Sequence, residues 1–180
     1  MKTRLRHRSA GWIAGLALTL CVSPHALAVD ASFVPTRLRL DPHFVLAQVA
    51  QRMGVTLRPE IAPPAVFLES VTSVAQFGDA IAVQWGFRPH VFSNAYAVER
   101  NEIYLIDDPS FYARLGRTID ESLAHELAHY IQVKYLNADL AVPAWEQDAN
   151  AVQAWFRDVH IRARATELGH RAGPQSDGGG

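Results

Sequence analysis

Residues 125–129 read His-Glu-Leu-Ala-His, so that two histidines stand four residues apart and a glutamate follows the first. On an α-helix, His125 and His129 fall about 40° apart on one face, where both can bind one metal ion while Glu126 stands beside it. Zinc suits such a pair, because neutral imidazole nitrogen is a good zinc ligand and a catalytic zinc has three protein ligands and one open position. Glu126 is placed to take a proton from a water at that position, which is the chemistry of metal-assisted hydrolysis.

The helix that must carry this motif is predicted over residues 118–135. Thr118 and Glu121 have the spacing of a capping box, and no glycine or proline occurs from Thr118 to Val142. The face opposite the histidines is apolar and is expected to be buried. It consists of Leu123, Ala124, Leu127, Ala128 and Ile131.

A third ligand is expected among the carboxylates that follow His129, namely Asp139, Glu146 and Asp148. Asp139 lies in a linker and reaches the histidines only if that loop turns back. The other two open a second helix, predicted from Pro143 to Leu168. Because a short loop joins the two helices, Glu146 can face the two histidines from the edge of the apolar stripe. That stripe consists of Trp145, Ala149, Val152, Trp155, Phe156, Val159 and Ala163.

Two further helices are predicted before the motif. Asp41-Pro42 has the form of an N-cap followed by proline at the first helical position, and apolar residues recur with helical spacing over residues 42–53. Residues 55–64 contain three prolines and are expected to be irregular. A second helix over residues 70–85 is expected to bury Val71, Val74, Ala75, Ala82 and Trp85.

A hairpin is predicted between these helices and the motif. Residues 96–98 and 102–106 are β-branched or aromatic runs on either side of the polar turn 99–101. An exposed edge of such a hairpin can pair with an extended peptide, and an ordinary core hairpin is the alternative. The sequence Asp107-Asp108-Pro109 is interpreted as a turn and the start of a helix rather than as a metal cluster.

Residues 1–28 are predicted to be a secretory signal, with a retained N-terminal anchor as the alternative. This prediction rests on a basic start (Lys2, Arg4, Arg6 and Arg8), an apolar run over residues 11–22 and a small-residue cleavage site at 26–28. The only cysteine, Cys21, lies in this segment, so the mature chain is expected to have no disulfide. Of 17 basic residues four leave with the signal, so 13 remain against 18 acidic ones. The resulting charge, about −5, argues against binding to nucleic acid or to anionic membranes.

The expected fold class is α+β. We expect a short antiparallel sheet with a site helix and a second ligand-bearing helix, in a single domain over residues 29–168. The tail over residues 169–180 is polar and rich in glycine, and we expect it to be disordered.

The pattern of His125-Glu126-x-x-His129 followed by Glu146-x-x-Ala149-Asn150 on its own helix resembles the gluzincin class of zinc metallopeptidases. The resemblance covers about residues 94–157 and implies a small zincin-like domain. It implies that His125, His129 and Glu146 are zinc ligands and that Glu126 is the catalytic base. Asn150 would orient a ligand histidine through its other ring nitrogen. The chain is also similar to short secreted H-E-x-x-H proteins of unassigned function, in which a Tyr … Ile-Tyr-Leu strand precedes a Ser-Leu-x-His-Glu-Leu-x-His-x-x-Gln helix. In this sequence the matching residues are Tyr96, 103–105 and 122–132.

Three functions compete at this point. The first is a secreted or periplasmic zinc-dependent metallopeptidase that acts on a peptide or protein substrate, with no nucleic acid partner and no stable membrane association after signal cleavage. The second is a non-catalytic metal-binding or interaction module with the same fold, and the third is a metal-free interaction protein whose motif is accidental. Candidates to stabilise an oxyanion are Tyr130, Tyr135, Arg157 and His160, while His160, His43 and His90 are more typical of surface or packed histidines than of ligands.

Overall fold

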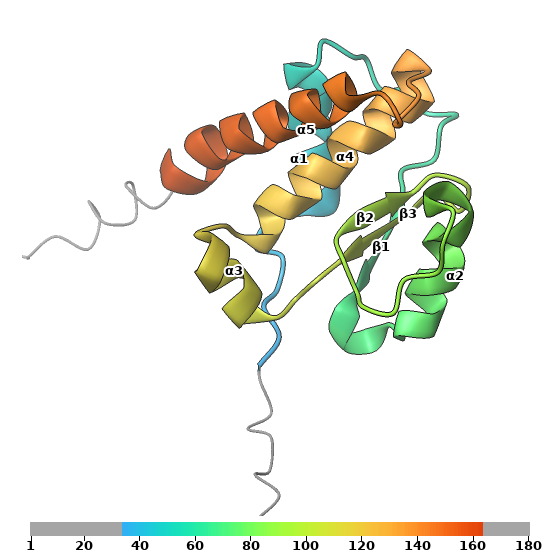
Figure 1. Ribbon diagram of the computed structural model, residues 1–180. Helices are drawn as coiled ribbons and strands as arrows, with labels where there is room; N and C mark the ends of the chain where they lie inside the picture. The colour runs from blue at the N-terminus through green and yellow to red at the C-terminus, as the bar shows by residue number, and fades with distance from the viewer. Residues whose placement is uncertain (1–33, 164–180) are drawn as a thin grey trace, which may run out of the picture. The chain divides into compact units, whose positions relative to one another are not determined.

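The computed structural model describes residues 34–163, which fold as an α+β unit of five α-helices and three short strands (Figure 1). The predicted signal at residues 1–28, the end of the second site helix after residue 163 and the tail at 169–180 lie outside the described residues. In chain order the elements are α1 Pro42–Arg52, β1 Ala65–Leu68, a 3-10 turn Glu69–Val71, α2 Val74–Trp85, β2 Ala95–Ala97, β3 Glu102–Leu105, α3 Pro109–Leu115, α4 Ile119–Leu136, α5 Pro143–Phe156 and a π-helical segment Arg157–Arg162.

The sheet is mixed, with strand order β1-β3-β2. The predicted hairpin is confirmed, since β2 pairs antiparallel with β3 and Tyr96 stands opposite Ile103. The prediction of a wholly antiparallel sheet is wrong, because β1 pairs parallel with β3 and places Val66 opposite Ile103. The four residues of β1 are too few to show a period of two, and a parallel partner requires a long crossover, which α2 and β2 provide here.

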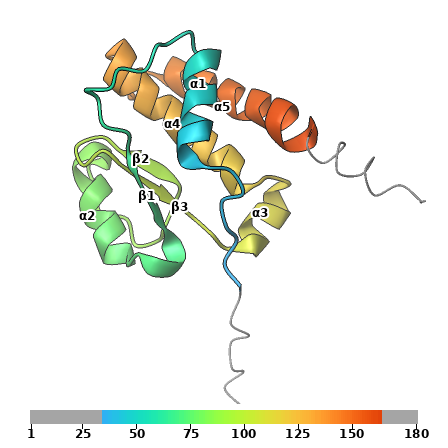
Figure 2. The ribbon, with the colours of Figure 1, turned by 180° about the vertical axis from the view of Figure 1, so that it is seen from behind.

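The two faces of the sheet pack against different helices. Tyr96, Ile103 and Leu105 belong to the core formed with α1, α4 and α5. Their neighbours in sequence, Ala95 and Tyr104, belong to a second core with Phe77 and Ile81 of α2. Successive strand residues point to opposite faces, so β2 and β3 are covered on both sides, by α2 on one face and by α1, α4 and α5 on the other (Figures 1 and 2).

The buried face of α2 differs from the prediction. The helix begins only at Val74, after Ser73, whose side chain accepts a hydrogen bond from the Gln76 N–H and caps it. The expected core residues Val71 and Val74 are 82% and 40% exposed. The 3-10 turn before Ser73 separates Val71 from the helical period, so the sheet is covered by a different face, which consists of Phe77, Gly78, Ala80 and Ile81.

The predicted turn at Asp107-Asp108-Pro109 is confirmed as the start of α3. Asp108 is the N-cap and accepts from the Ser110 N–H at 2.7 Å, and Pro109 occupies the first helical position. Asp107 is buried and accepts from both the backbone N–H and the hydroxyl of Ser70. Both carboxylates are therefore structural.

Helices α4 and α5 lie side by side in both views, and α1 packs on α4 (Figures 1 and 2). Ala149, Val152 and Phe156 of the predicted stripe on α5 are buried, but Val159 is 46% exposed. Residues Arg157–Arg162 are π-helical, and the wider turn rotates the stripe away from the core. Within residues 34–163, no helix is both long and apolar enough to span a bilayer.

Candidate metal centre

The motif helix α4 is fixed at both ends by local capping. At its start the Thr118 hydroxyl accepts a hydrogen bond from the Glu121 N–H at 3.3 Å. At its end Asn137 adopts the left-handed conformation, with φ 54°. The predicted apolar back of the helix is buried in the main core. The opposite face therefore presents His125 and His129 away from the core at a fixed spacing of one turn.

Three side chains from α4 and α5 converge in front of this face. The Nε2 atoms of His125 and His129 lie 3.1 Å apart. One carboxylate oxygen of Glu146 lies 3.1 Å from the Nε2 of His129, and the other lies 3.5 Å from the Nε2 of His125. Among the residues described, this is the only group of three or more His, Cys, Asp or Glu side chains placed to hold a metal ion.

The spacing of these atoms fits a tetrahedral zinc ion. With ligand distances of about 2.0–2.1 Å, the edges of a zinc tetrahedron measure about 3.3 Å. The two imidazole nitrogens lie 3.1 Å apart, and they lie 3.1 and 3.5 Å from the two oxygens of the Glu146 carboxylate, which is close to that edge. Two imidazole nitrogens and one carboxylate oxygen also form a ligand set that catalytic zinc uses. The residues present therefore fit a metal ion held by three protein ligands.

Gln132, to which the sequence assigned no role, sets the orientation of His129. Its Nε2 donates to the carbonyl of Trp145 at 2.8 Å, and its Oε1 lies 2.8 Å from the Nδ1 of His129. A carbonyl can only accept, so the amide must direct its oxygen at the imidazole, and Nδ1 must carry the proton. The Nε2 of His129 then keeps its lone pair for a metal. Gln132 is fully buried, which holds this arrangement rigidly.

His125 is also in the form that a metal requires. Burial, followed by the proximity of His129, holds its pKa well below the usual range for histidine, so the ring is neutral at pH 7. Its Nδ1 is buried and has no partner within hydrogen-bonding distance among the described residues. The side chain of Gln153 lies near the ring and raises the pKa of His125, against the larger effect of burial.

Asn150 acts on a different group from the one expected. It was predicted to orient a histidine, but its Nδ2 donates to the Glu146 carboxylate and to the Glu146 carbonyl, each at 2.9 Å. Because the two residues stand one turn apart on α5, this bond fixes the rotamer of the exposed Glu146 side chain. The ring of His129 is held by Gln132 instead.

Glu126 is buried beside the three candidate ligands. Burial, followed by repulsion from Glu146, raises the pKa of its carboxyl group to about 8, and a hydrogen bond from the Tyr96 backbone opposes this shift. A carboxyl group with a pKa near neutrality can both take up and release a proton at pH 7. Its contact with Tyr96 also ties it to the edge strand β2.

The cluster opens into two adjoining hollows. One of about 300 Å³ extends from Glu126 toward Trp85 and Leu140, and one of about 180 Å³ extends toward Asn150 and Arg117. Both hollows are lined by Asn94, His125, Glu126 and Glu146. The site is therefore an open groove that crosses the ligand atoms.

The residues named as oxyanion candidates line neither hollow. Tyr130 and Tyr135 line a separate hollow, and the Tyr130 hydroxyl donates to the Ala62 carbonyl. Arg157 pairs with Asp158, and His160 packs against the rings of Phe44, Trp155 and Phe156. The other residues considered as ligands, namely Asp139, Asp148, His43 and His90, lie outside the cluster.

Asn94 and Arg117 lie at the groove and were missed from the sequence. Asn94 directly precedes β2, and its amide is fixed because its Oδ1 accepts from the Ile106 N–H at 2.7 Å. Arg117 directly precedes the N-cap of α4. A single asparagine and a single arginine in loops carry no pattern, so only the fold identifies them.

Comparison of the chain with protein-family models, with curated proteins and with solved structures finds no match.

Proposed function

We propose that this protein is an exported zinc-dependent hydrolase that cleaves peptide or amide bonds. One observation carries the proposal: the Nε2 atoms of His125 and His129 lie 3.1 Å apart, and the two carboxylate oxygens of Glu146 lie 3.1 and 3.5 Å from them, near the edge of a zinc tetrahedron. The buried carboxyl group of Glu126 lies beside this cluster. A resident zinc would supply a positive charge that lowers the pKa of a nearby water and of the Glu126 carboxyl group.

The residues of the chain divide the remaining work. The Glu126 carboxylate takes a proton from the attacking water and delivers it to the leaving amine nitrogen. Gln132 keeps the Nε2 lone pair of His129 directed at the metal position, and Asn150 holds the Glu146 carboxylate there. Ligands fixed in this way need no rearrangement during the reaction.

Negative charge that develops on the substrate oxygen needs a donor, and the groove offers two. The Asn94 amide and the Arg117 guanidinium both line the hollow that contains His125, Glu126 and Glu146. Arg117 is exposed, and none of the ion pairs identified within residues 34–163 involves it. Both side chains can donate to an oxyanion held at the metal position.

A metal-binding module without hydrolysis is the second candidate. It is favoured by the absence of Tyr130, Tyr135, Arg157 and His160 from the part of the groove that the structure describes. Such a module would keep the three ligands and use Glu126 only to fill the site. The two candidates differ in whether Glu126 is needed for turnover.

The test compares zinc-loaded wild type with Glu126→Gln. We expect both proteins to bind one zinc ion, and we expect hydrolysis of a pool of unstructured decapeptides to fall about a hundredfold or more in the variant. Equal hydrolysis by the two proteins would exclude Glu126 as the base. Stoichiometric zinc without any hydrolysis by the wild type would favour the non-catalytic module.

A further inference from the structure

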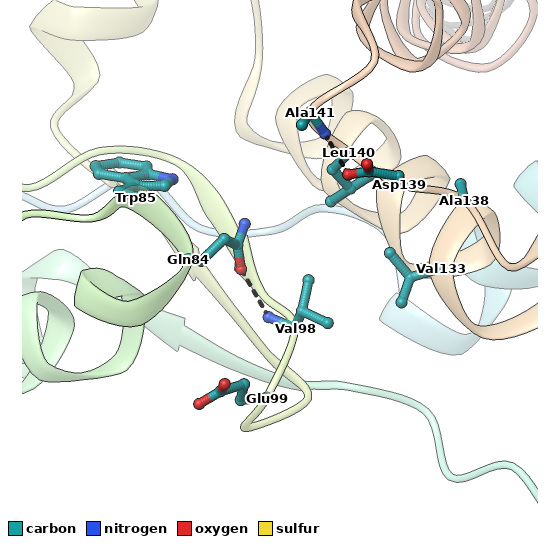
Figure 3. A pocket seen from close by; sticks show the side chains of 9 residues that line it. All are labelled: Gln84, Trp85, Val98, Glu99, Val133, Ala138, Asp139, Leu140 and Ala141. Carbon is teal, nitrogen blue, oxygen red and sulfur yellow. Dashed lines mark hydrogen bonds between the residues drawn. The ribbon is translucent and has the colours of Figure 1, made fainter.

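The outer edge of β2 borders the groove, and a side chain covers part of it. Among the strands of residues 34–163, β2 pairs with β3 alone and is therefore an edge strand. On the open side the Tyr96 carbonyl accepts from the Nε2 of Gln84 at 3.2 Å. The Val98 N–H donates to the Oε1 of Gln84 at 3.0 Å (Figure 3). One carboxamide therefore occupies an acceptor and a donor of the strand edge.

A carboxamide is chemically equivalent to a peptide group. An extended peptide that adds to a sheet edge uses the same type of N–H and C=O contacts that Gln84 makes. The Gln84 side chain is exposed and stands at the end of α2, so it can swing away without disturbing the core. The neighbouring Tyr96 N–H is directed at Glu126, so a chain paired with this edge passes beside the predicted base.

The groove continues past Gln84 into a larger hollow of about 460 Å³. Gln84, Trp85 and Leu140 line both this outer hollow and the one that contains the two histidines. Figure 3 shows Val98 and Gln84 on one side of the outer hollow and Val133, Leu140 and Ala141 on the other. Its lining is largely apolar, and the carboxylates of Glu99 and Asp139 stand among the lining residues.

We propose that the Gln84 carboxamide is a displaceable cap on the β2 edge, and that an extended polypeptide enters the site by taking over its two hydrogen bonds and placing an apolar side chain in the outer hollow. The inference rests on the proposed function in taking polypeptide as the substrate. A peptide whose side chain in the outer hollow is acidic is disfavoured, because the carboxylates of Glu99 and Asp139 repel it.

The test measures KM and kcat of the zinc-loaded protein on the best-cleaved member of a decapeptide pool. Removal of the cap in Gln84→Ala should lower KM about fivefold, the factor that one net hydrogen bond contributes, and leave kcat within about twofold. Gln84→Met keeps the length of the side chain, loses both hydrogen bonds and should also lower KM. Gln51→Ala, an exposed glutamine on α1, is the matched control and should match the wild type. An unchanged or raised KM in both Gln84 variants would overturn the cap.

A second readout separates failure of the cap from failure of hydrolysis. If zinc-loaded wild type cleaves nothing, the same decapeptides are titrated into it while the NMR signal of the Val98 amide is followed. A shift of that signal, with tighter binding to Gln84→Ala, supports the cap and counts against hydrolysis. An unmoved Val98 signal at saturating peptide overturns the cap.

Discussion

The Oε1 of Gln132 lies 2.8 Å from the Nδ1 of His129, which stands one turn before it on the same helix, α4. The same amide donates to the carbonyl of Trp145, the residue directly before Glu146. One buried side chain thus fixes both the tautomer of a ligand on α4 and the start of α5.

Gln132→Leu is expected to weaken zinc binding by about 10–100-fold, because the His129 ring loses the acceptor that sets its tautomer. Titration with a zinc chelator of known affinity measures the effect. Gln147→Leu, at an exposed position of α5, is the matched control and should bind zinc as the wild type does. Equal affinity in Gln132→Leu would show that the ring is oriented by other contacts.

Glu146→Gln should reduce zinc affinity by more than about a hundredfold, since a neutral amide replaces the only carboxylate in the cluster. Asp148→Asn removes the same charge two residues away on the same helix, from a side chain outside the cluster, and should leave the affinity unchanged. Isothermal titration of zinc into both variants decides the assignment. If Asp148→Asn has the larger effect, the ligand has been misassigned.

The parts of the site that local sequence determines could be predicted. Thr118 begins α4 through its own hydroxyl, and the loop between the site helices is short enough to bring Glu146 to the histidines. The role of Gln132 could not be predicted, because it depends on the Trp145 carbonyl of another helix. The parallel pairing of β1 depends on a partner, β3, that comes 37 residues later, so its four residues alone give no signal.

The stability of the metal-free protein should depend on Asp120. Its buried carboxylate accepts from the backbone N–H groups of Arg39 and Leu40, at 3.0 Å each. Burial raises its pKa above the ordinary 3.8, against the effect of these hydrogen bonds. A raised pKa means that its stabilising contribution is complete below pH 3.8 and is lost as the pH rises through the folded-state value.

Asp120→Asn keeps the accepting oxygen and has no charge to bury. Its free energy of unfolding, measured with urea in the presence of EDTA, should therefore improve relative to wild type between about pH 4 and pH 7. Asp120→Ala leaves the two N–H groups without an acceptor and should lose about 1–3 kcal/mol at every pH. A difference between wild type and Asp120→Asn that does not change with pH would contradict the raised pKa.

Gly78 tests how α2 is held against the loop that follows it. A Cβ at this position would lie 3.0 Å from the Cγ of Arg88 and 3.3 Å from the carbonyl oxygen of Pro89. Arg88 cannot easily move, because it pairs with Asp79 at 2.8 Å and donates to the Ala75 carbonyl. Helix propensity alone favours Gly78→Ala by about 1 kcal/mol. We expect the overpacking to outweigh this gain and to lower the free energy of unfolding by about 1 kcal/mol net.

Val83→Ala separates propensity from packing in the same helix. Val83 is 72% exposed, so its replacement gains helix propensity without a steric cost and should change stability by less than about 0.5 kcal/mol. Urea unfolding of both variants gives the comparison. If Gly78→Ala is as stable as Val83→Ala or more so, Arg88 and Pro89 yield to the methyl group, and the glycine is not required for close packing of the loop. A loss in Gly78→Ala alone would show that the contact between this loop and α2 selects glycine in spite of its cost to the helix.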